Sequence, residues 1–192
     1  MKTFSRKIAD TLIQNGAEPT MKAVYAYGIE CTLSTLLVLV LQIAAGFILG
    51  KPLYMVVFIA AWLPLRMLAG GAHANTHAVC TLISVGLAAA AVLLAEKAGS
   101  ISPEAAAVIG LLSYAFFFAA APVIHKNHPI SLRKYKGMRI AVRIYAALEC
   151  AVIILLAYRS SPFAWCALAA YASTAALSLW GFQDRYKPRE SA

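Results

Sequence analysis

C-T-L-S-T-L-L-V-L-V-L-Q-I-A-A-G-F-I-L, Cys31–Leu49, indicates the fold class, because its 19 residues carry no charge. A helix needs about 20 apolar residues to cross roughly 30 Å of hydrocarbon, and this stretch can extend back to Ala23. Of the 192 residues, 61% are hydrophobic and 13% are charged, against about 45–50% and about 25% in soluble proteins. We therefore predict an all-α, polytopic integral membrane protein.

Five further apolar runs follow the first one. The second run, Leu53–Leu65, is short, with Pro64 near its end and Arg66 directly after it. Such a length fits a broken or re-entrant segment as well as a span. We predict six transmembrane helices that form a bundle over residues 23–182 of a single domain, 1–192, with a polar cytoplasmic tail at 183–192. The five later runs are 53–65, 78–95, 105–124, 140–158 and 163–182.

The N-terminal segment, residues 1–22, is predicted to hold a cytoplasmic amphipathic helix. Phe4, Ile8 and Leu12 share one helical face, while Arg6 and Lys7 lie elsewhere on it. An apolar face with a basic flank favours a helix lying on an anionic membrane surface, with a solvated tail as the alternative. No uninterrupted apolar core or small-residue cleavage site follows, so we do not expect a removable signal peptide.

The lysines and arginines are distributed unequally between the two sides of the predicted bundle. For six crossings, fourteen fall on the side of the two termini and three on the other side. Positive residues concentrate in cytoplasmic loops, so both termini are predicted to be cytoplasmic. The net charge of +9 is thus a topology signal. We expect no binding of nucleic acid, because no basic strip interleaved with aromatic residues is present.

Reactive side chains are concentrated in R-M-L-A-G-G-A-H-A-N-T-H-A-V-C-T-L-I-S, residues 66–84. An imidazole that takes the proton of a nearby thiol makes a nucleophile, which predicts a cysteine peptidase or acyl transferase. Cys80 lies within about one turn of a predicted helix start at Asn75 or Thr76, where the helix dipole favours a thiolate. The other cysteines lie inside apolar spans and are predicted to be structural: Cys31, Cys150 and Cys166.

Two histidines compete for the role of base. His77 is three positions before Cys80 and shares its helical face, so spacing favours His77. His73 is seven positions before Cys80, about 10.5 Å away along a continuous helix, which is too far for a hydrogen bond. Gly70 and Gly71 permit a chain reversal that could bring His73 back over the helix start.

These residues carry a resemblance to a known family. Arg66, Gly71, His73 and Cys80 follow the pattern R-x-x-x-G-G-x-H, with the cysteine seven positions after the histidine. This pattern resembles the signature of the AgrB-type accessory gene regulator proteins. The segment A-P-V-I-H-K-N-H-P-I-S, residues 121–131, and the basic run after it are similar to the family's second polar segment. The likeness covers essentially the whole chain in length and layout, and its first motif is the more specific.

The resemblance implies a membrane cysteine endopeptidase that processes an AgrD-like propeptide for quorum sensing. By the family pattern Cys80 is the nucleophile and His73 the base, which overrules the spacing preference for His77. Cys80 would cleave the propeptide through a thioester, and a cysteine or serine of the propeptide would then close a thiolactone or lactone ring. The resemblance also implies a bacterial cell membrane location and a homodimer. The charge distribution places the active site on the cytoplasmic side, and we expect contact with membrane lipid and no cofactor.

Other charged residues could support the reaction, and their roles follow less directly from the sequence. Arg66 would bind a carboxylate of the propeptide or hold its loop, or else extend toward the interface as a snorkelling side chain. Glu149, in the middle of a span, is costly unless it is paired, so we expect a basic partner, and it could orient His73. The basic run would attract an acidic propeptide tail or anchor the topology; it comprises Arg133, Lys134, Lys136 and Arg139.

Two other functions compete with the peptidase. His73, His77 and Cys80 read H-x-x-x-H-x-x-C and could bind zinc, although Ala74 stands where metalloproteases usually carry a glutamate. A small transporter would need paired charges near the middle of the membrane, and only Glu149 qualifies. A serine hydrolase is not expected, because the sequence contains no G-x-S-x-G pattern.

Overall fold

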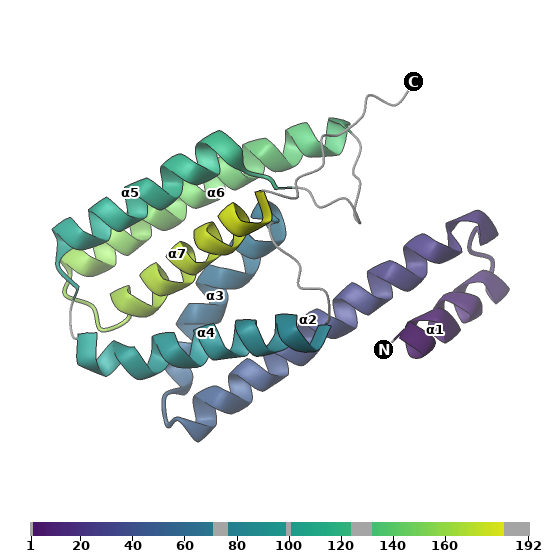
Figure 1. Ribbon diagram of the computed structural model, residues 1–192, viewed down its shortest axis with the longest axis horizontal. Helices are drawn as coiled ribbons and strands as arrows, with labels where there is room; N and C mark the ends of the chain where they lie inside the picture. The colour runs from purple at the N-terminus through teal and green to yellow at the C-terminus, as the bar shows by residue number, and fades with distance from the viewer. Residues whose placement is uncertain (1, 71–76, 99–100, 124–131, 183–192) are drawn as a thin grey trace. The chain divides into compact units, whose positions relative to one another are not determined.

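The computed structural model describes residues 2–70, 77–98, 101–123 and 132–182, and it is helical throughout these ranges except for turns and one isolated bridge (Figure 1). This confirms the predicted all-α class for the described part of the chain. The elements are α1 (Lys2–Gln14), the 3-10 helix η1 (Pro19–Met21), α2 (Lys22–Ile48), α3 (Pro52–Ala69), α4 (His77–Ala98), α5 (Pro103–Ala120), α6 (Leu132–Tyr158) and α7 (Ala164–Gly181).

Among the described residues, five helical stretches are long and apolar enough to cross a membrane, as expected of a multi-pass membrane protein. They coincide with the first five predicted runs and are Pro19–Ile48, Pro52–Ala69, Ala78–Ala95, Pro103–Ala120 and Lys134–Tyr158. The second run is one continuous helix, α3, which contains Pro64 and continues past Arg66. A helix in apolar surroundings tolerates proline where neighbouring groups compensate for the lost hydrogen bond.

The sixth predicted run also forms a helix, α7, but this helix is not among those five. Hydroxyl residues such as Ser173, Thr174 and Ser178 lower its apolar character, and most of the helix is buried inside the protein. A helix that is buried on most of its faces packs against other helices rather than against lipid. The number of six spans, and the cytoplasmic termini that depend on it, therefore stay predictions.

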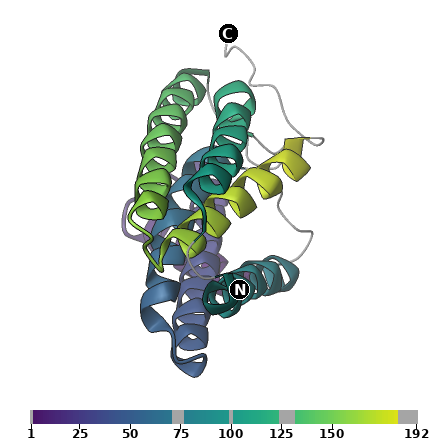
Figure 2. The ribbon, with the colours of Figure 1, turned by 90° about the vertical axis from the view of Figure 1, so that its left-hand side faces the viewer.

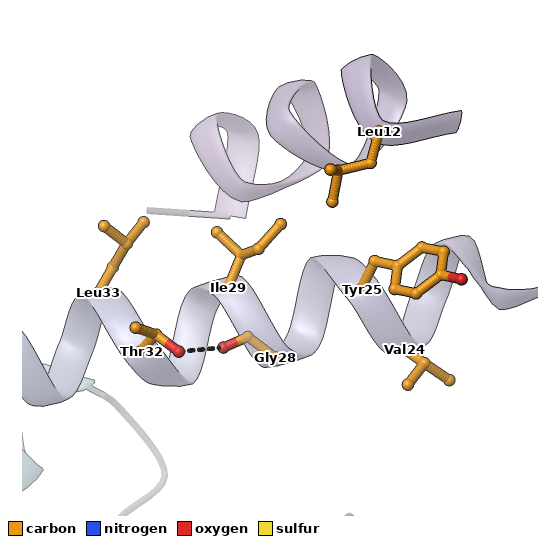
Figure 3. A pocket seen from close by; sticks show the side chains of 7 residues that line it. All are labelled: Leu12, Val24, Tyr25, Gly28, Ile29, Thr32 and Leu33. Carbon is orange, nitrogen blue, oxygen red and sulfur yellow. Dashed lines mark hydrogen bonds between the residues drawn. The ribbon is translucent and has the colours of Figure 1, made fainter. Parts of the chain in front are cut away.

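The chain divides into two compact units, residues 1–41 and 42–192, each described by itself. In the first unit Ser5 and Ala9 are the buried residues of α1, whereas Phe4 and Leu12 are exposed. Leu12 faces an apolar groove along α2, in which the Thr32 hydroxyl donates to the Gly28 carbonyl at 2.9 Å (Figure 3). The interfacial placement of α1 stays a prediction.

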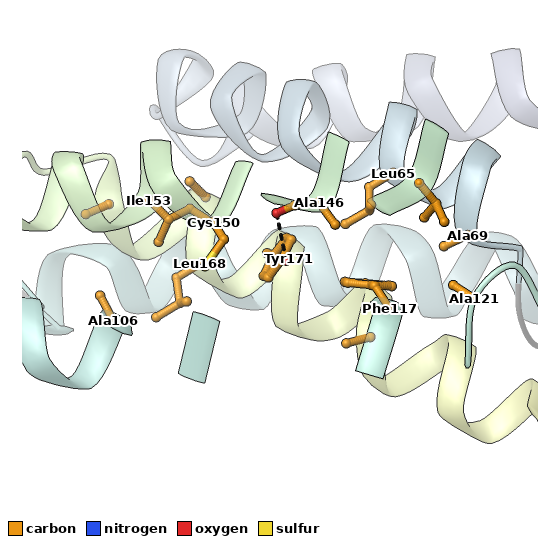
Figure 4. Packing of buried hydrophobic residues seen from close by; sticks show 14 of the residues in the cluster. Leu65, Ala69, Ala106, Phe117, Ala121, Ala146, Cys150, Ile153, Leu168 and Tyr171 are labelled. Carbon is orange, nitrogen blue, oxygen red and sulfur yellow. Dashed lines mark hydrogen bonds between the residues drawn. The ribbon is translucent and has the colours of Figure 1, made fainter. Parts of the chain in front are cut away.

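In the second unit, α5 and α6 lie side by side in both ribbon views, and α7 packs against α3, α5 and α6 (Figures 1 and 2). Tyr171 of α7 is fully buried at the centre of the core. Its hydroxyl donates to the Ala146 carbonyl of α6 at 2.9 Å, and its ring centroid lies 5.3 Å from that of Phe117 on α5 (Figure 4). The core thus joins α7 to α5 and α6.

Candidate functional site

The end of α3 is attached to the chain that leaves α5. The Val123 N–H donates to the Ala69 carbonyl at 2.8 Å, and Gly70 and Val123 form an isolated parallel bridge. Gly70 has φ +68°, and a Cβ atom there would lie 2.3 Å from the Val123 carbonyl oxygen. Both the backbone angle and the close approach therefore require glycine. These contacts fix the chain directly before Gly71.

The carbonyl of Gly70 accepts hydrogen bonds from two side chains. Arg66 Nη1, one turn earlier on α3, donates at 2.5 Å. Ser178 Oγ, on α7, donates at 3.2 Å. Of the roles considered for Arg66, this contact supports holding the loop, because the half-buried guanidinium turns back onto its own helix end.

Cys80 lies in the first turn of α4, as predicted, and is half-buried. Its carbonyl accepts a hydrogen bond from the Ser84 hydroxyl at 2.9 Å. The Ser84 carbonyl in turn accepts from Nε2 of Gln42, a fully buried residue of α2, at 3.1 Å. The first two turns of α4 are thus tied to a neighbouring helix, which restricts the backbone of Cys80. The predicted caps, Asn75 and Thr76, lie outside the described residues.

Arg66 and Cys80 lie within electrostatic range of each other. The guanidinium of Arg66, at the end of α3, interacts electrostatically with Cys80, at the start of α4. Sequence position alone did not predict this pairing, because fourteen positions separate the two residues.

The histidines cannot be placed against the sulfur. Gly71 and His73 lie outside the described residues, and His77 is the first residue of α4 with a side chain that is not described. The choice of base therefore stays a prediction. In the described part of the chain no group of three His, Cys, Asp or Glu residues could hold a metal ion. The zinc alternative depends on His73 and His77 and is likewise left as a prediction.

The basic run begins α6. Lys134 and Lys136 are exposed near its start, and the side chain of Arg133 lies outside the described residues. Further along the helix, Arg143 donates from Nε and Nη2 to the Phe118 carbonyl of α5 at 3.0 and 2.7 Å. Its Cζ atom lies 4.1 Å from the centroid of the Phe118 ring. Arg143 therefore joins α6 to the end of α5, a packing role that the charge pattern did not reveal.

Glu149 is buried in α6, with 9% of its surface exposed. Neither of its carboxylate oxygens accepts a hydrogen bond from any residue that the structure describes. The predicted basic partner is thus not found in this part of the chain. The groups whose electrostatic environment includes Glu149 are Tyr145, Cys150 and Tyr171, which carry no positive charge. A role for Glu149 in orienting His73 stays a prediction.

The other three cysteines are predicted to have packing roles, and they differ in how deeply they are buried. Cys150 and Cys166 are buried, and the Cys150 sulfur packs 3.0 Å from where a Cβ of Gly110 would stand. Cys31, on α2, is half-buried.

Sequence reasoning missed Gly70 and Ser178 as neighbours in the site. No local signal could have joined them, because the contact spans 108 positions.

Comparisons with known proteins agree with the family resemblance that the sequence carries. The family model described as accessory gene regulator B, AgrB, matches residues 5–180. An AgrB-like protein 2 of Clostridium perfringens (strain 13 / Type A) is 28% identical over 145 residues, which cover 70% of this chain and 68% of that protein. An AgrB-like protein of Clostridium perfringens (strain SM101 / Type A) is 27% identical over 165 residues, which cover 80% and 76%. No solved structure matches the chain.

Proposed function

Because the chain belongs to the accessory gene regulator B (AgrB) family, we propose that it is a membrane cysteine endopeptidase that cleaves an AgrD-like propeptide through Cys80. Members of this family take part in quorum sensing by processing such a propeptide. The observation that carries the proposal is the position of Cys80 in the first turn of α4, within electrostatic range of the guanidinium of Arg66. A half-buried sulfur at the start of a helix, within electrostatic range of a cation, suits a nucleophile better than a packing residue.

The proposed reaction begins with proton transfer from the Cys80 thiol to the imidazole of His73. The thiolate attacks the scissile carbonyl and forms a C–S bond, and Arg66 stabilises the sulfur charge before the attack. The C–N bond then breaks, the imidazolium returns its proton to the departing amine, and the C-terminal tail leaves. The N-terminal part of the propeptide remains attached to Cys80 as a thioester.

The second step forms the cyclic product. A thiol or hydroxyl within the retained peptide attacks the thioester carbonyl, gives its proton to His73, and displaces the Cys80 thiolate. The products are a thiolactone or lactone ring and the regenerated enzyme. A thioester keeps the acyl group ready for transfer, provided that water is excluded, and a site at the membrane edge supports that exclusion. We place this site on the cytoplasmic side, where the exposed Lys134 and Lys136 would attract an acidic tail.

The test is cleavage of a co-reconstituted propeptide by the full-length protein in lipid vesicles. Cys80→Ser should abolish cleavage, and His73→Ala should do the same, while Cys31→Ser serves as the matched cysteine control and should keep wild-type activity. Unchanged cleavage by Cys80→Ser would refute the proposal. Loss of cleavage in His77→Ala, with His73→Ala active, would move the base to His77.

A chelator separates the peptidase from the zinc alternative. Cysteine–imidazole chemistry needs no metal, so cleavage should be insensitive to prolonged treatment with a strong chelator. Activity that is lost on chelation and restored by zinc alone would favour His73, His77 and Cys80 as metal ligands.

A further inference from the structure

We propose that Ser178 of α7 is a positioning residue for this reaction, because it fixes the carbonyl of Gly70 at the point where the chain leaves α3 toward His73. The inference rests on the proposed function. Arg66, Gly70, Val123 and Ser178 are called the Gly70 clamp below. Ser178 itself touches neither the propeptide nor the reacting atoms in this proposal.

The first argument is the direction of the Ser178 hydroxyl. Serine and threonine in helices usually donate to a carbonyl of their own preceding turn. Two neighbours on α7 do this, since Ser173 and Thr174 both donate to the Ala170 carbonyl at 2.9 Å. Ser178 instead donates across the bundle to Gly70 at 3.2 Å. Its hydroxyl is therefore used for a tertiary contact between α7 and the end of α3.

The second argument is rigidity. Ser178 is fully buried, and it lies on a helix that is buried along most of its length. The Val123 backbone also lies close to Gly70, with its N–H bound to the Ala69 carbonyl at 2.8 Å. Arg66 supplies the second donor to the same carbonyl. The Gly70 peptide is thus held by α3, by α7 and by the chain after α5.

The third argument is the position of the clamp in the sequence. Gly70 directly precedes Gly71, and His73 follows three positions after Gly70. Arg66, a member of the clamp, also interacts with Cys80. The clamp therefore directly precedes the segment that carries His73, and one of its members interacts with Cys80. Catalytic groups have to be held close to their productive geometry, and small displacements produce large losses in rate.

Removal of the hydroxyl should weaken catalysis without unfolding the protein. In Ser178→Ala the Gly70 carbonyl keeps its bond to Arg66, so no buried acceptor loses its last partner. The Gly70 peptide gains freedom to rotate. We expect kcat to fall about tenfold. KM should stay within twofold, because the residues expected to meet the propeptide are unchanged.

The experiment uses the full-length protein in lipid vesicles, with Ser173→Ala as the matched control on the same helix. Three quantities are measured for each variant: kcat and KM for propeptide cleavage, thermal stability, and the rate of Cys80 alkylation by iodoacetamide against pH, read by peptide mass spectrometry. The alkylation profile reports how well a base is coupled to the thiol and needs no propeptide. Ser178→Ala should shift this profile toward that of His73→Ala, whereas Ser173→Ala should keep the wild-type profile.

Each result bears on the clamp. A tenfold lower kcat with a shifted alkylation profile and a stability close to that of Ser173→Ala supports it. A kcat within twofold of wild type with an unchanged profile overturns it, and so does an equal loss in both serine variants, which would indicate a general packing role. If Cys80→Ser still cleaves, the proposed function fails. In that case only the alkylation profiles test the positioning role of Ser178. A profile of Ser178→Ala that equals the wild-type profile overturns this role.

Discussion

Two polar groups of the bundle differ in their hydrogen bonds. The carbonyl of Gly70, a half-buried residue, receives hydrogen bonds from Arg66 and Ser178. The carboxylate of Glu149, which is buried, receives none from the described residues. A buried polar group without a partner costs free energy, whereas a fully bonded one fixes local geometry. The hydrogen bonds to the Gly70 carbonyl therefore fix the end of α3, which directly precedes the candidate site.

The largest effect is expected from Gly70→Ala. The new Cβ would meet the Val123 carbonyl oxygen at 2.3 Å, and φ +68° is strained for alanine. The end of α3 must then separate from Val123, so we expect cleavage activity to fall by about 100-fold or more. Gly86→Ala is the matched control, because a Cβ at Gly86 meets nothing within 4 Å. Equal activities of the two variants in the vesicle assay would show that the tight contact at Gly70 is dispensable.

The next effect is expected from Arg66. Arg66→Met removes a donor to Gly70 and the positive charge beside Cys80, and we expect kcat to fall roughly 30- to 100-fold. Arg66→Lys keeps the charge but not the planar fork of donors, so it should recover only part of this loss. The ratio of the two rates separates the electrostatic contribution from the positional one. Near wild-type activity of Arg66→Met would mean that neither interaction of Arg66 contributes to the reaction.

The smallest effect on activity is expected from a substitution of Glu149, the second of the two polar groups compared above. Glu149→Leu replaces a buried carboxylate that accepts no hydrogen bond from the described residues with an apolar side chain, so the free energy of unfolding should rise by about 1–3 kcal/mol. Thermal unfolding in vesicles measures the change, and propeptide cleavage should stay within twofold of wild type. A large loss of cleavage with unchanged stability would instead support the predicted role of Glu149 in orienting His73.

Much of the fold could be predicted from the sequence, because lipid imposes a simple rule on helix length and apolar content. Runs such as Cys31–Leu49 and Ala78–Ala95 coincide with helices that could span a membrane. Of the alternatives left open for the second run, a break at Pro64 is not found, since α3 continues to Ala69. Hydropathy also gave no reason to place α7 at the centre of the core, because burial by neighbouring helices depends on packing that an apolar run does not encode.

The candidate site was predictable only in its local parts. The position of Cys80 in a first helical turn followed from the pattern before it. The contact between Arg66 and Cys80, and the hydrogen bond from Ser178 to Gly70, depend on how α3, α4 and α7 pack. Such tertiary contacts join distant positions and leave no periodic signal. A partner for Glu149 was expected from the cost of burial, yet that rule cannot show whether a fold supplies the partner.

The thioester on Cys80 is the most direct test of the account. The full-length protein and its propeptide are mixed in vesicles, quenched in acid after a short time and digested for peptide mass spectrometry. We predict that the peptide containing Cys80 gains the mass of the N-terminal part of the propeptide, that hydroxylamine removes the added mass, and that Cys80→Ser shows none. Cleavage that proceeds without any adduct on Cys80, or with the adduct on another residue, would contradict the account.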